Sequence, residues 1–301
     1  MPLRRYKGRN SVSYKRRSKS RKPAPKRRKY AKRRPMTRKR VLNIASVKKA
    51  DTMGTTSVRA DGTTFREPFV MNGDKTYMIP WIATWRNFQT SSTNSTRGLR
   101  QDPTRSATSC YMRGLKENIQ LGTNDGQCWQ WRRICFTMKG DDIYSNQSTQ
   151  FRIAFQSSAG YQRVFCDWNN DKTNGSTTYP APSVMLAGPV FKGTLGQDWD
   201  DPFIAPVDPL RVTLKYDKTR YLRSGNNFGM LKTTRLWHPM NATLHYDDDE
   251  NGGVEDGATV SVKTHGMGDY YVIDLFRAAT GAVAGSQLNL RSTSTLYWHE
   301  K

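Results

Sequence analysis

Acidic residues are missing from the first part of the chain. Residues 1–49 contain no Asp or Glu, yet they hold 22 of the 49 Lys and Arg residues. The rest of the 301-residue chain carries 27 Lys and Arg against 25 Asp and Glu, so it is nearly neutral although the whole chain has a net charge of +24. Such a block of like charge cannot pack into a core, and it typically stays disordered and binds an oppositely charged polymer. The sequence therefore predicts a basic arm joined to a neutral body.

Cysteine is scarce, and the cysteines present form no recognised motif. They are Cys110, Cys128, Cys135 and Cys166. None belongs to a C-x-x-C pair or has a His at zinc-binding spacing, which argues against a zinc site. So few cysteines in a chain of this length also argue against a disulfide scaffold, so we expect reduced thiols in an intracellular protein, with Cys acting as a small buried apolar residue.

Catalytic motifs and long apolar runs are absent too. The sequence has no H-E-x-x-H and no G-x-S-x-G, and we expect the scattered His238, His245, His265 and His299 to pack or cap. No apolar run approaches the ~20 residues of a membrane helix, and none follows the charged N-terminus as in a secretory signal. We therefore expect a protein that is not an enzyme, needs no cofactor and does not bind a membrane.

The basic arm, residues 1–40, has the composition of a nucleic-acid-binding segment. Residues 26–40 read KRRKYAKRRPMTRKR, and ten of these fifteen are Lys or Arg. Unopposed cations bind phosphates independently of sequence, and tyrosines stack on unpaired bases. A solvated tail is the alternative, which so many unopposed charges disfavour. The predicted phosphate-binding residues, which include the cations just beyond the arm, are Arg4, Arg5, Lys7, Arg9, Lys15, Arg16, Arg17, Lys19, Arg21, Lys22, Lys26, Arg27, Arg28, Lys29, Lys32, Arg33, Arg34, Arg38, Lys39, Arg40, Lys48 and Lys49. The predicted stacking residues are Tyr6, Tyr14 and Tyr30.

Two clusters of the arm also fit a nuclear import signal. They lie in KPAPKRRK (22–29) and KRR (32–34), and their basic residues are Lys26, Arg27, Arg28, Lys29, Lys32, Arg33 and Arg34. Host import carriers read clusters of this kind, but the same residues serve nucleic acid and any basic tail would match.

The body, residues 41–301, has the period-two pattern of half-buried strands. PLRVTLKYD (209–217), FRIAF (151–155) and SQLNLRSTSTLYW (286–298) alternate, whereas GDYYVIDLF (268–276) resembles a strand buried on both faces. Polar turn clusters separate these runs, and there is no long helical period. The pattern predicts an all-β domain of two antiparallel sheets with long loops, for which a jelly roll is one of the few closed solutions. We interpret VLNIASV (41–47) as the point where the chain becomes anchored.

The segment WQWRRICFTM (129–138) shifts its apolar phase near Arg132 and Arg133. Trp129 and Trp131 are on one phase and Ile134 is on the other, so a β-bulge is predicted between them. The two arginines are further candidates for phosphate binding, although the sequence does not determine which way they face.

An acidic segment, YDDDENGGVED (246–256), partly fits a calcium-binding loop. Asp247, Asp249, Asn251 and Glu255 fall near ligand positions. Ala258 stands where a bidentate carboxylate is required, so we favour an exposed acidic turn or a salt bridge to a neighbouring subunit.

Tryptophan is plentiful. The residues are Trp81, Trp85, Trp129, Trp131, Trp168, Trp199, Trp237 and Trp298. Base-stacking platforms are one interpretation, but we favour core and subunit-interface positions for most of them.

Several longer segments carry a resemblance to a known family. They are TRKRVLNIASVKKADTM (37–53), CYMRGLKENIQL (110–121), DGQCWQWRRICFTMKG (125–140), RVTLKYDKTR (211–220), LWHPMNATLHYDDDENGG (236–253), GMGDYYVIDLFR (266–277) and STLYWHEK (294–301). Together they resemble the capsid proteins of genomoviruses (gemycircularvirus-like), which are small circular single-stranded DNA viruses related to geminiviruses. The pattern departs at Cys128, where proline is expected.

The resemblance implies a viral jelly-roll subunit, residues 41–301, that assembles with copies of itself into a small icosahedral shell of T=1 symmetry. It further implies packaging of circular single-stranded DNA, and localisation in the virion and in the host nucleus during assembly. Two other classes stay open from the residues alone. One is a cellular chromatin or ribonucleoprotein factor with a similar arm, and the other is a nuclease using the carboxylates at 247–250.

Overall fold

The structure is a computed structural model that describes residues 36–88, 103–252 and 254–300; the side chains of residues 38, 39, 254 and 255 lie outside the description. The chain divides into two units, Met1–Leu42 and Asn43–Lys301. The predicted boundary lies at residues 40 and 41.

Strands are the main secondary structure of the described chain. In chain order they are β1 (Val47–Met53), β2 (Thr55–Val58), β3 (Thr64–Phe65), β4 (Phe69–Asn72), β5 (Thr76–Ile82), β6 (Ser109–Thr123), β7 (Trp129–Met138), β8 (Gln156–Ser157), β9 (Gly160–Tyr161), β10 (Arg163–Phe165), β11 (Lys172–Asn174), β12 (Thr177–Tyr179), β13 (Thr213–Leu222), β14 (Leu231–His245), β15 (Asp249–Asn251), β16 (Val254–Asp256), β17 (Asp269–Ala278) and β18 (Gln287–Glu300). The helical elements are α1 (Arg38–Ala45), the 3-10 turn η2 (Tyr144–Asn146) and α2 (Ser183–Val190). No helix in the described part of the chain is long and apolar enough to cross a membrane.

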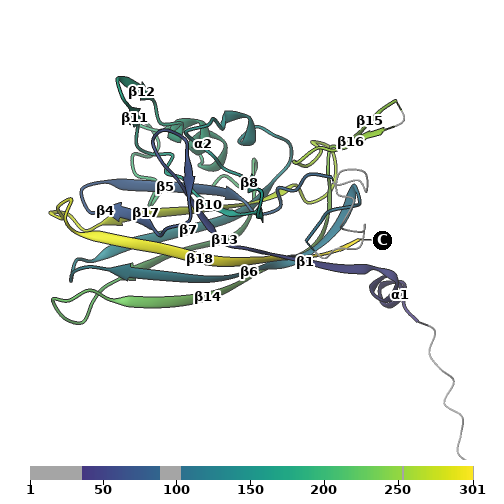
Figure 1. The fold of residues 1–301 in the computed structure, drawn as a ribbon, viewed down its shortest axis with the longest axis horizontal. Coiled ribbons are helices and arrows are strands. Elements are labelled where there is room, and N and C mark those ends of the chain that lie inside the picture. The colour runs from purple at the N-terminus through teal and green to yellow at the C-terminus, as the bar shows by residue number, and fades with distance from the viewer. Residues whose placement is uncertain (1–35, 89–102, 253, 301) are drawn as a thin grey trace, which may run out of the picture. The chain divides into compact units, whose positions relative to one another are not determined.

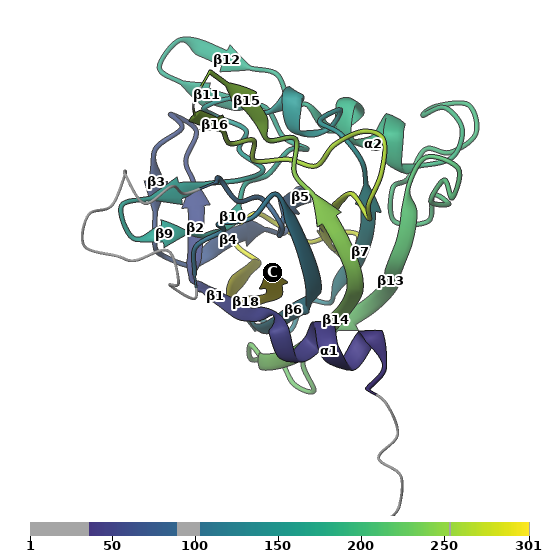
Figure 2. The ribbon, with the colours of Figure 1, turned by 90° about the vertical axis from the view of Figure 1, so that its right-hand side faces the viewer.

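Two sheets form the framework of the body (Figure 1). The first sheet has the order β1-β18-β6-β14, and β4 continues the edge occupied by β1 by pairing with the other end of β18. The second sheet has the order β13-β7-β17-β5. Figure 2 shows the strands of the first sheet side by side when they are viewed near their ends.

The strand order identifies the fold. Among the described residues, the strands of seven or more residues are eight: β1, β5, β6, β7, β13, β14, β17 and β18. Numbered in that order, the sheets read 1-8-3-6 and 5-4-7-2. This is the double-sheet jelly roll, a fold found in viral capsid proteins, lectins and cupins. The predicted all-β jelly-roll class is confirmed.

Two of the predicted strands are found with the expected faces. Strand β18 buries Leu288, Leu290, Leu296 and Trp298 on one phase. Strand β17 is buried on both faces over Asp269–Phe276. One of its faces packs against the first sheet, and loops and α2 cover the other.

The β-bulge predicted at Arg132 and Arg133 is wrong. Strand β7 pairs with β17 without a register shift, and the bulge lies in the neighbouring strand β13, between Leu214 and Tyr216. Both faces of β7 are buried, so the apolar pattern changes phase while the backbone stays regular. The arginines interrupt the pattern because each one is buried with a carboxylate partner.

Three local predictions need correction. Residues 151–155 form no strand, although Phe151 and Ile153 are buried. Leu210 precedes β13 in a turn and is 92% exposed, so it does not share a face with Val212. In VLNIASV the first five residues complete α1, and pairing in a sheet begins only at Val47.

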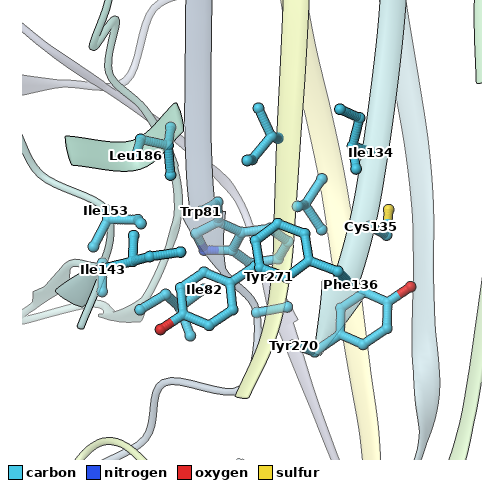
Figure 3. Close-up of a cluster of buried hydrophobic side chains, with 14 of the residues drawn as sticks. Trp81, Ile82, Ile134, Cys135, Phe136, Ile143, Ile153, Leu186, Tyr270 and Tyr271 are labelled. Atoms are coloured by element: carbon cyan, nitrogen blue, oxygen red, sulfur yellow. The ribbon is translucent and has the colours of Figure 1, made fainter. Parts of the chain in front are cut away.

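Apolar side chains from distant segments meet against the second sheet. Figure 3 shows Trp81 of β5, Phe136 of β7 and Tyr271 of β17 in one cluster with side chains from the covering segments. The rings of Phe136 and Tyr271 stack with centroids 5.2 Å apart. Of the four cysteines, Cys110, Cys135 and Cys166 are buried free thiols, as expected, and Cys128 is half-buried.

A cluster of charged groups lies buried between the two sheets. Glu117 of β6 accepts a hydrogen bond from Arg133 of β7 at 2.6 Å, and Arg133 also donates to Asp274 of β17 at 2.7 Å. Arg163 of β10 donates to Asp274 at 2.8 Å, and His238 Nε2 of β14 lies 3.3 Å from Glu117. Two guanidinium ions therefore balance two carboxylates where water is excluded.

Removing one member of this ion cluster should destabilise the fold strongly. Glu117→Gln leaves a buried cation without its counter-charge, which costs about 3–5 kcal/mol in comparable buried pairs. We expect the free energy of unfolding to fall by that amount, as measured by urea unfolding followed by far-UV circular dichroism.

The matched control is Asp141→Asn, which removes an exposed partner of Lys263 at 2.9 Å. Exposed ion pairs contribute little, so the unfolding midpoint should hardly change. Equal losses in the two variants would contradict the importance of the ion cluster.

The cluster should also make stability depend on acid. Burial acts to raise the pKa of Glu117, but the neighbouring Arg133, His238 and Arg163 outweigh it and lower that pKa to about 2. The contribution of ionised Glu117 to the free energy of unfolding is therefore complete above the ordinary pKa near 4.5 and is lost as the pH falls towards 2. It amounts to about 3 kcal/mol. Thermal unfolding between pH 5 and 2.5 should be steeper in pH for the wild type than for Glu117→Gln; parallel curves would refute this.

Candidate nucleic-acid interface

Most residues of the predicted arm lie outside the described residues. This applies to the predicted phosphate contacts Arg4, Arg5, Lys7, Arg9, Lys15, Arg16, Arg17, Lys19, Arg21, Lys22, Lys26, Arg27, Arg28, Lys29, Lys32, Arg33 and Arg34, to Tyr6, Tyr14 and Tyr30, and to the whole predicted import signal. Arg38, Lys39 and Arg40 lie in the first turn of α1.

Lys48 and Lys49, adjacent on β1, point to opposite faces of the first sheet. Lys48 is exposed and makes no ion pair with a described carboxylate. Lys49 is buried, with its ammonium 2.7 Å from Glu300 and donating to Thr104 O and Ser106 Oγ, each at 2.7 Å. Because its charge is neutralised inside the subunit, Lys49 leaves the set of candidate phosphate contacts.

Glu300 is the acidic partner at the end of β18. Its side chain is 4% exposed and that of Lys49 is 1% exposed. Burial acts to raise the pKa of Glu300, but hydrogen bonds from Lys49, Ser106 and Trp298 outweigh it and lower that pKa. This ion pair therefore links β1 to the adjacent strand β18.

Arg132 and Arg133 are also unavailable to phosphate. Arg132 pairs with Asp217 at 2.6 Å and donates to the carbonyl oxygens of Pro202 and Ala205. Arg133 belongs to the buried ion cluster. The prediction that Arg132 and Arg133 contact phosphate is therefore wrong.

The acidic segment forms the hairpin β15–β16, in which Asp249 pairs with Asp256 and Asn251 with Val254. Within the described chain no three potential metal ligands converge, there or elsewhere. The candidate ligands Asp247, Asp249 and Asn251 are exposed, and nothing is described of the Glu255 side chain. Sequence reasoning did not single out Asp248, which is buried and forms a bidentate pair with Arg105.

The outward face of the first sheet carries cations and no acids. Its residues on β1, β18, β6 and β14 include the exposed Lys48, Arg113, Lys116, Arg235 and Arg291. The carboxylates of these four strands are Asp51, Glu117 and Glu300, and all three point into the body. None of the five cations forms an ion pair with a carboxylate in the described residues. This set of outward residues is called the basic face below.

An aromatic pair lies in the basic face. Trp237 of β14 is 49% exposed, and its ring centroid lies 5.9 Å from that of Tyr297 of β18. Strand β6 runs between them, and its Gly114 stands opposite Tyr297. A Cβ at Gly114 would lie 2.7 Å from the Trp237 ring, so the absence of a side chain there lets the indole cross β6.

Sequence reasoning placed most tryptophans at core or subunit-interface positions, and six of the eight lie in the core. Trp81, Trp129, Trp131, Trp168, Trp199 and Trp298 are buried. The signal that distinguishes Trp237 is its phase, since it shares the outward phase of β14 with Arg235 and Pro239. Its meeting with Tyr297 depends on pairing through β6, which no local pattern shows.

Comparison with known proteins adds little. No protein-family model matches the chain, and no curated protein matches it. Solved structures that match include the parvovirus (densovirus) from Galleria mellonella, 9% identical over 90% of this chain and 89% of that chain, with a TM-score of 0.17. Another is VP1 of Trichodysplasia spinulosa-associated polyomavirus in complex with GM1 oligosaccharide, 8% identical over 83% of this chain and 75% of that chain, with a TM-score of 0.09. Scores this low carry no argument, and the fold assignment depends on the strand order.

The two lysines of β1 give a matched test. Lys49→Gln leaves Glu300 buried without a counter-charge, so its melting temperature should fall clearly, by the equivalent of about 3 kcal/mol. Lys48→Gln should leave the melting temperature unchanged. If Lys48 contacts phosphate, its loss should reduce the salt-dependence slope of oligonucleotide affinity by roughly 0.7. The same melting temperature in both variants would refute the assignment of the two faces.

Proposed function

We propose that this chain is the coat protein of a small virus with a single-stranded DNA genome. Copies of the jelly-roll body form a closed icosahedral shell, and the basic arm neutralises the packaged DNA. The uneven distribution of charge carries this proposal: residues 1–49 hold 22 cations and no acids, whereas the rest of the chain is nearly neutral. A jelly roll alone is compatible with several functions. The basic arm in addition favours a protein that encloses nucleic acid.

The charge supports a genome of limited length. A shell of about 60 symmetric copies, the smallest icosahedral assembly, would bring roughly 1,200 arm charges to its interior. That number suits a single strand on the order of one to two thousand nucleotides, with one phosphate each. The finer terms, a circular genome of the genomovirus type and T=1 symmetry, follow from the sequence resemblance and stay predictions.

The arm also supports a nuclear step. Its clusters at 26–29 and 32–34 fit recognition by a host import carrier, so we propose assembly in the host nucleus and localisation in the virion. We propose a structural role without catalysis, and magnesium-dependent nuclease activity of the purified protein would contradict it.

Deleting residues 2–40 should abolish DNA packaging without unfolding the jelly-roll body. Because the body keeps its sheets and core, we expect the truncated protein to show the same β-rich far-UV spectrum as the full chain. We expect it to lose nuclease-protected DNA almost completely, since most of the phosphate-neutralising charge is gone. Electron microscopy and nuclease protection of particles from cells expressing each form would measure this.

The full-length protein supplies the deciding control. It should form closed particles about 20 nm across, the size expected of ~60 subunits. Monomers or dimers that bind DNA without forming particles would instead favour a chromatin or ribonucleoprotein factor. Normal DNA packaging by the truncated protein would refute the role of the arm.

A further inference from the structure

We propose that the basic face binds unpaired bases of single-stranded DNA, with Trp237 and Tyr297 as the stacking platform and the surrounding cations as phosphate contacts. The inference rests on the proposed function in one respect, because it takes the packaged strand as the occupant. It adds a second DNA-binding element, located on the folded body rather than on the arm.

The aromatic pair is placed as a stacking platform requires. Trp237 lies on an edge strand with half of its surface exposed, and the neighbouring Tyr297 ring is tilted to it by 58°. The space above Gly114 lets the indole lie across the sheet instead of standing away from it. An unpaired base that stacks on the exposed ring would remove apolar surface from water, and this contributes ~1–3 kcal/mol per base in single-strand-binding proteins.

The charges around the pair favour a polyanion. Lys116 stands directly opposite Trp237 in the sheet, and Arg235 lies two residues from it on the same face. Arg113, on β6, donates to Asn241 of the same face and has no carboxylate partner in the described residues. Burial lowers the pKa of His299, and the nearby like charges of Lys48 and Arg113 lower it further.

The basic face extends to strand β1. Strand β1 belongs to this sheet, and Lys48, the first outward cation after α1, is part of the basic face.

A second copy of the chain is a poorer occupant. Two basic faces repel each other. A protein surface without acidic residues would have to bury these five cations with no counter-charge, because the basic face itself carries no acid. Single-stranded DNA supplies one phosphate per nucleotide together with exposed base rings, so it satisfies both features of the surface.

The experiment compares two ligands that differ only in their bases. The full-length protein is titrated with oligo(dT) and with an abasic oligonucleotide of equal length, at about 0.5 M NaCl, where phosphate contacts are weakened for both. The ratio of the two Kd values measures base stacking. We expect Trp237→Ala to reduce the preference for oligo(dT) by roughly 5- to 100-fold, and Trp237→Phe to retain most of it.

The matched control is Tyr221→Ala, since Tyr221 is an exposed aromatic residue, 67% exposed, on β13 of the other sheet. It should leave the preference unchanged. A second readout needs no variant: photocrosslinking of 5-iododeoxyuridine oligonucleotides to the wild type should label Trp237 or Tyr297, as peptide mapping would show.

The outcomes separate this inference from the proposed function. An unchanged preference in Trp237→Ala, or crosslinks only in the arm, overturns the inference even if full-length shells package DNA. A Trp237-dependent preference in a protein that forms no shells supports base binding and refutes the coat-protein proposal. Loss of particles in Trp237→Ala with an unchanged preference would mean that the basic face is a contact between copies, which also overturns the inference.

Discussion

The ion cluster between the two sheets is the constraint on which the rest of the body depends. Glu117, Arg133, Arg163 and Asp274 come from four strands, and each has hydrogen bonds only if those strands keep one register. Burying four charges contributes little net stability compared with an apolar core, but misplacing one is costly. A one-residue slip of β6 would turn Glu117 to the other face and leave Arg133 and Arg163 with only Asp274 as a counter-charge, so the cluster selects one arrangement of the two sheets.

The same register explains why a nearly neutral body has a cationic face. The carboxylates of the first sheet, Asp51, Glu117 and Glu300, all point inward, where Arg or Lys neutralises each of them. The charged residues that point outward from this sheet are therefore all cations. Counting charges along the sequence averages these two faces to near zero, whereas the folded sheet separates them.

Sequence patterns predicted what depends on local alternation and missed what depends on pairing across strands. The faces of β17 and β18 follow directly from period two. Arg132 and Arg133 were misinterpreted because a strand buried on both faces has no polar phase, and their partners Asp217 and Asp274 lie on neighbouring strands. Lys49 was assigned to phosphate because its partner Glu300 is distant in sequence, and nothing in the segment around Lys49 indicates that Glu300 lies beside it.

Arm and basic face would contact DNA by different physics. In the proposed function, the cations of the arm neutralise phosphates independently of sequence, and this binding weakens steeply with salt. Stacking on Trp237 depends much less on salt and requires an unpaired base, so it distinguishes a single strand from a duplex. A protein with the arm alone would package any nucleic acid of the right length. The proposed stacking on Trp237 would add a preference for single strands, and it requires the register of β6, β14 and β18 that brings Trp237 over Gly114 to Tyr297.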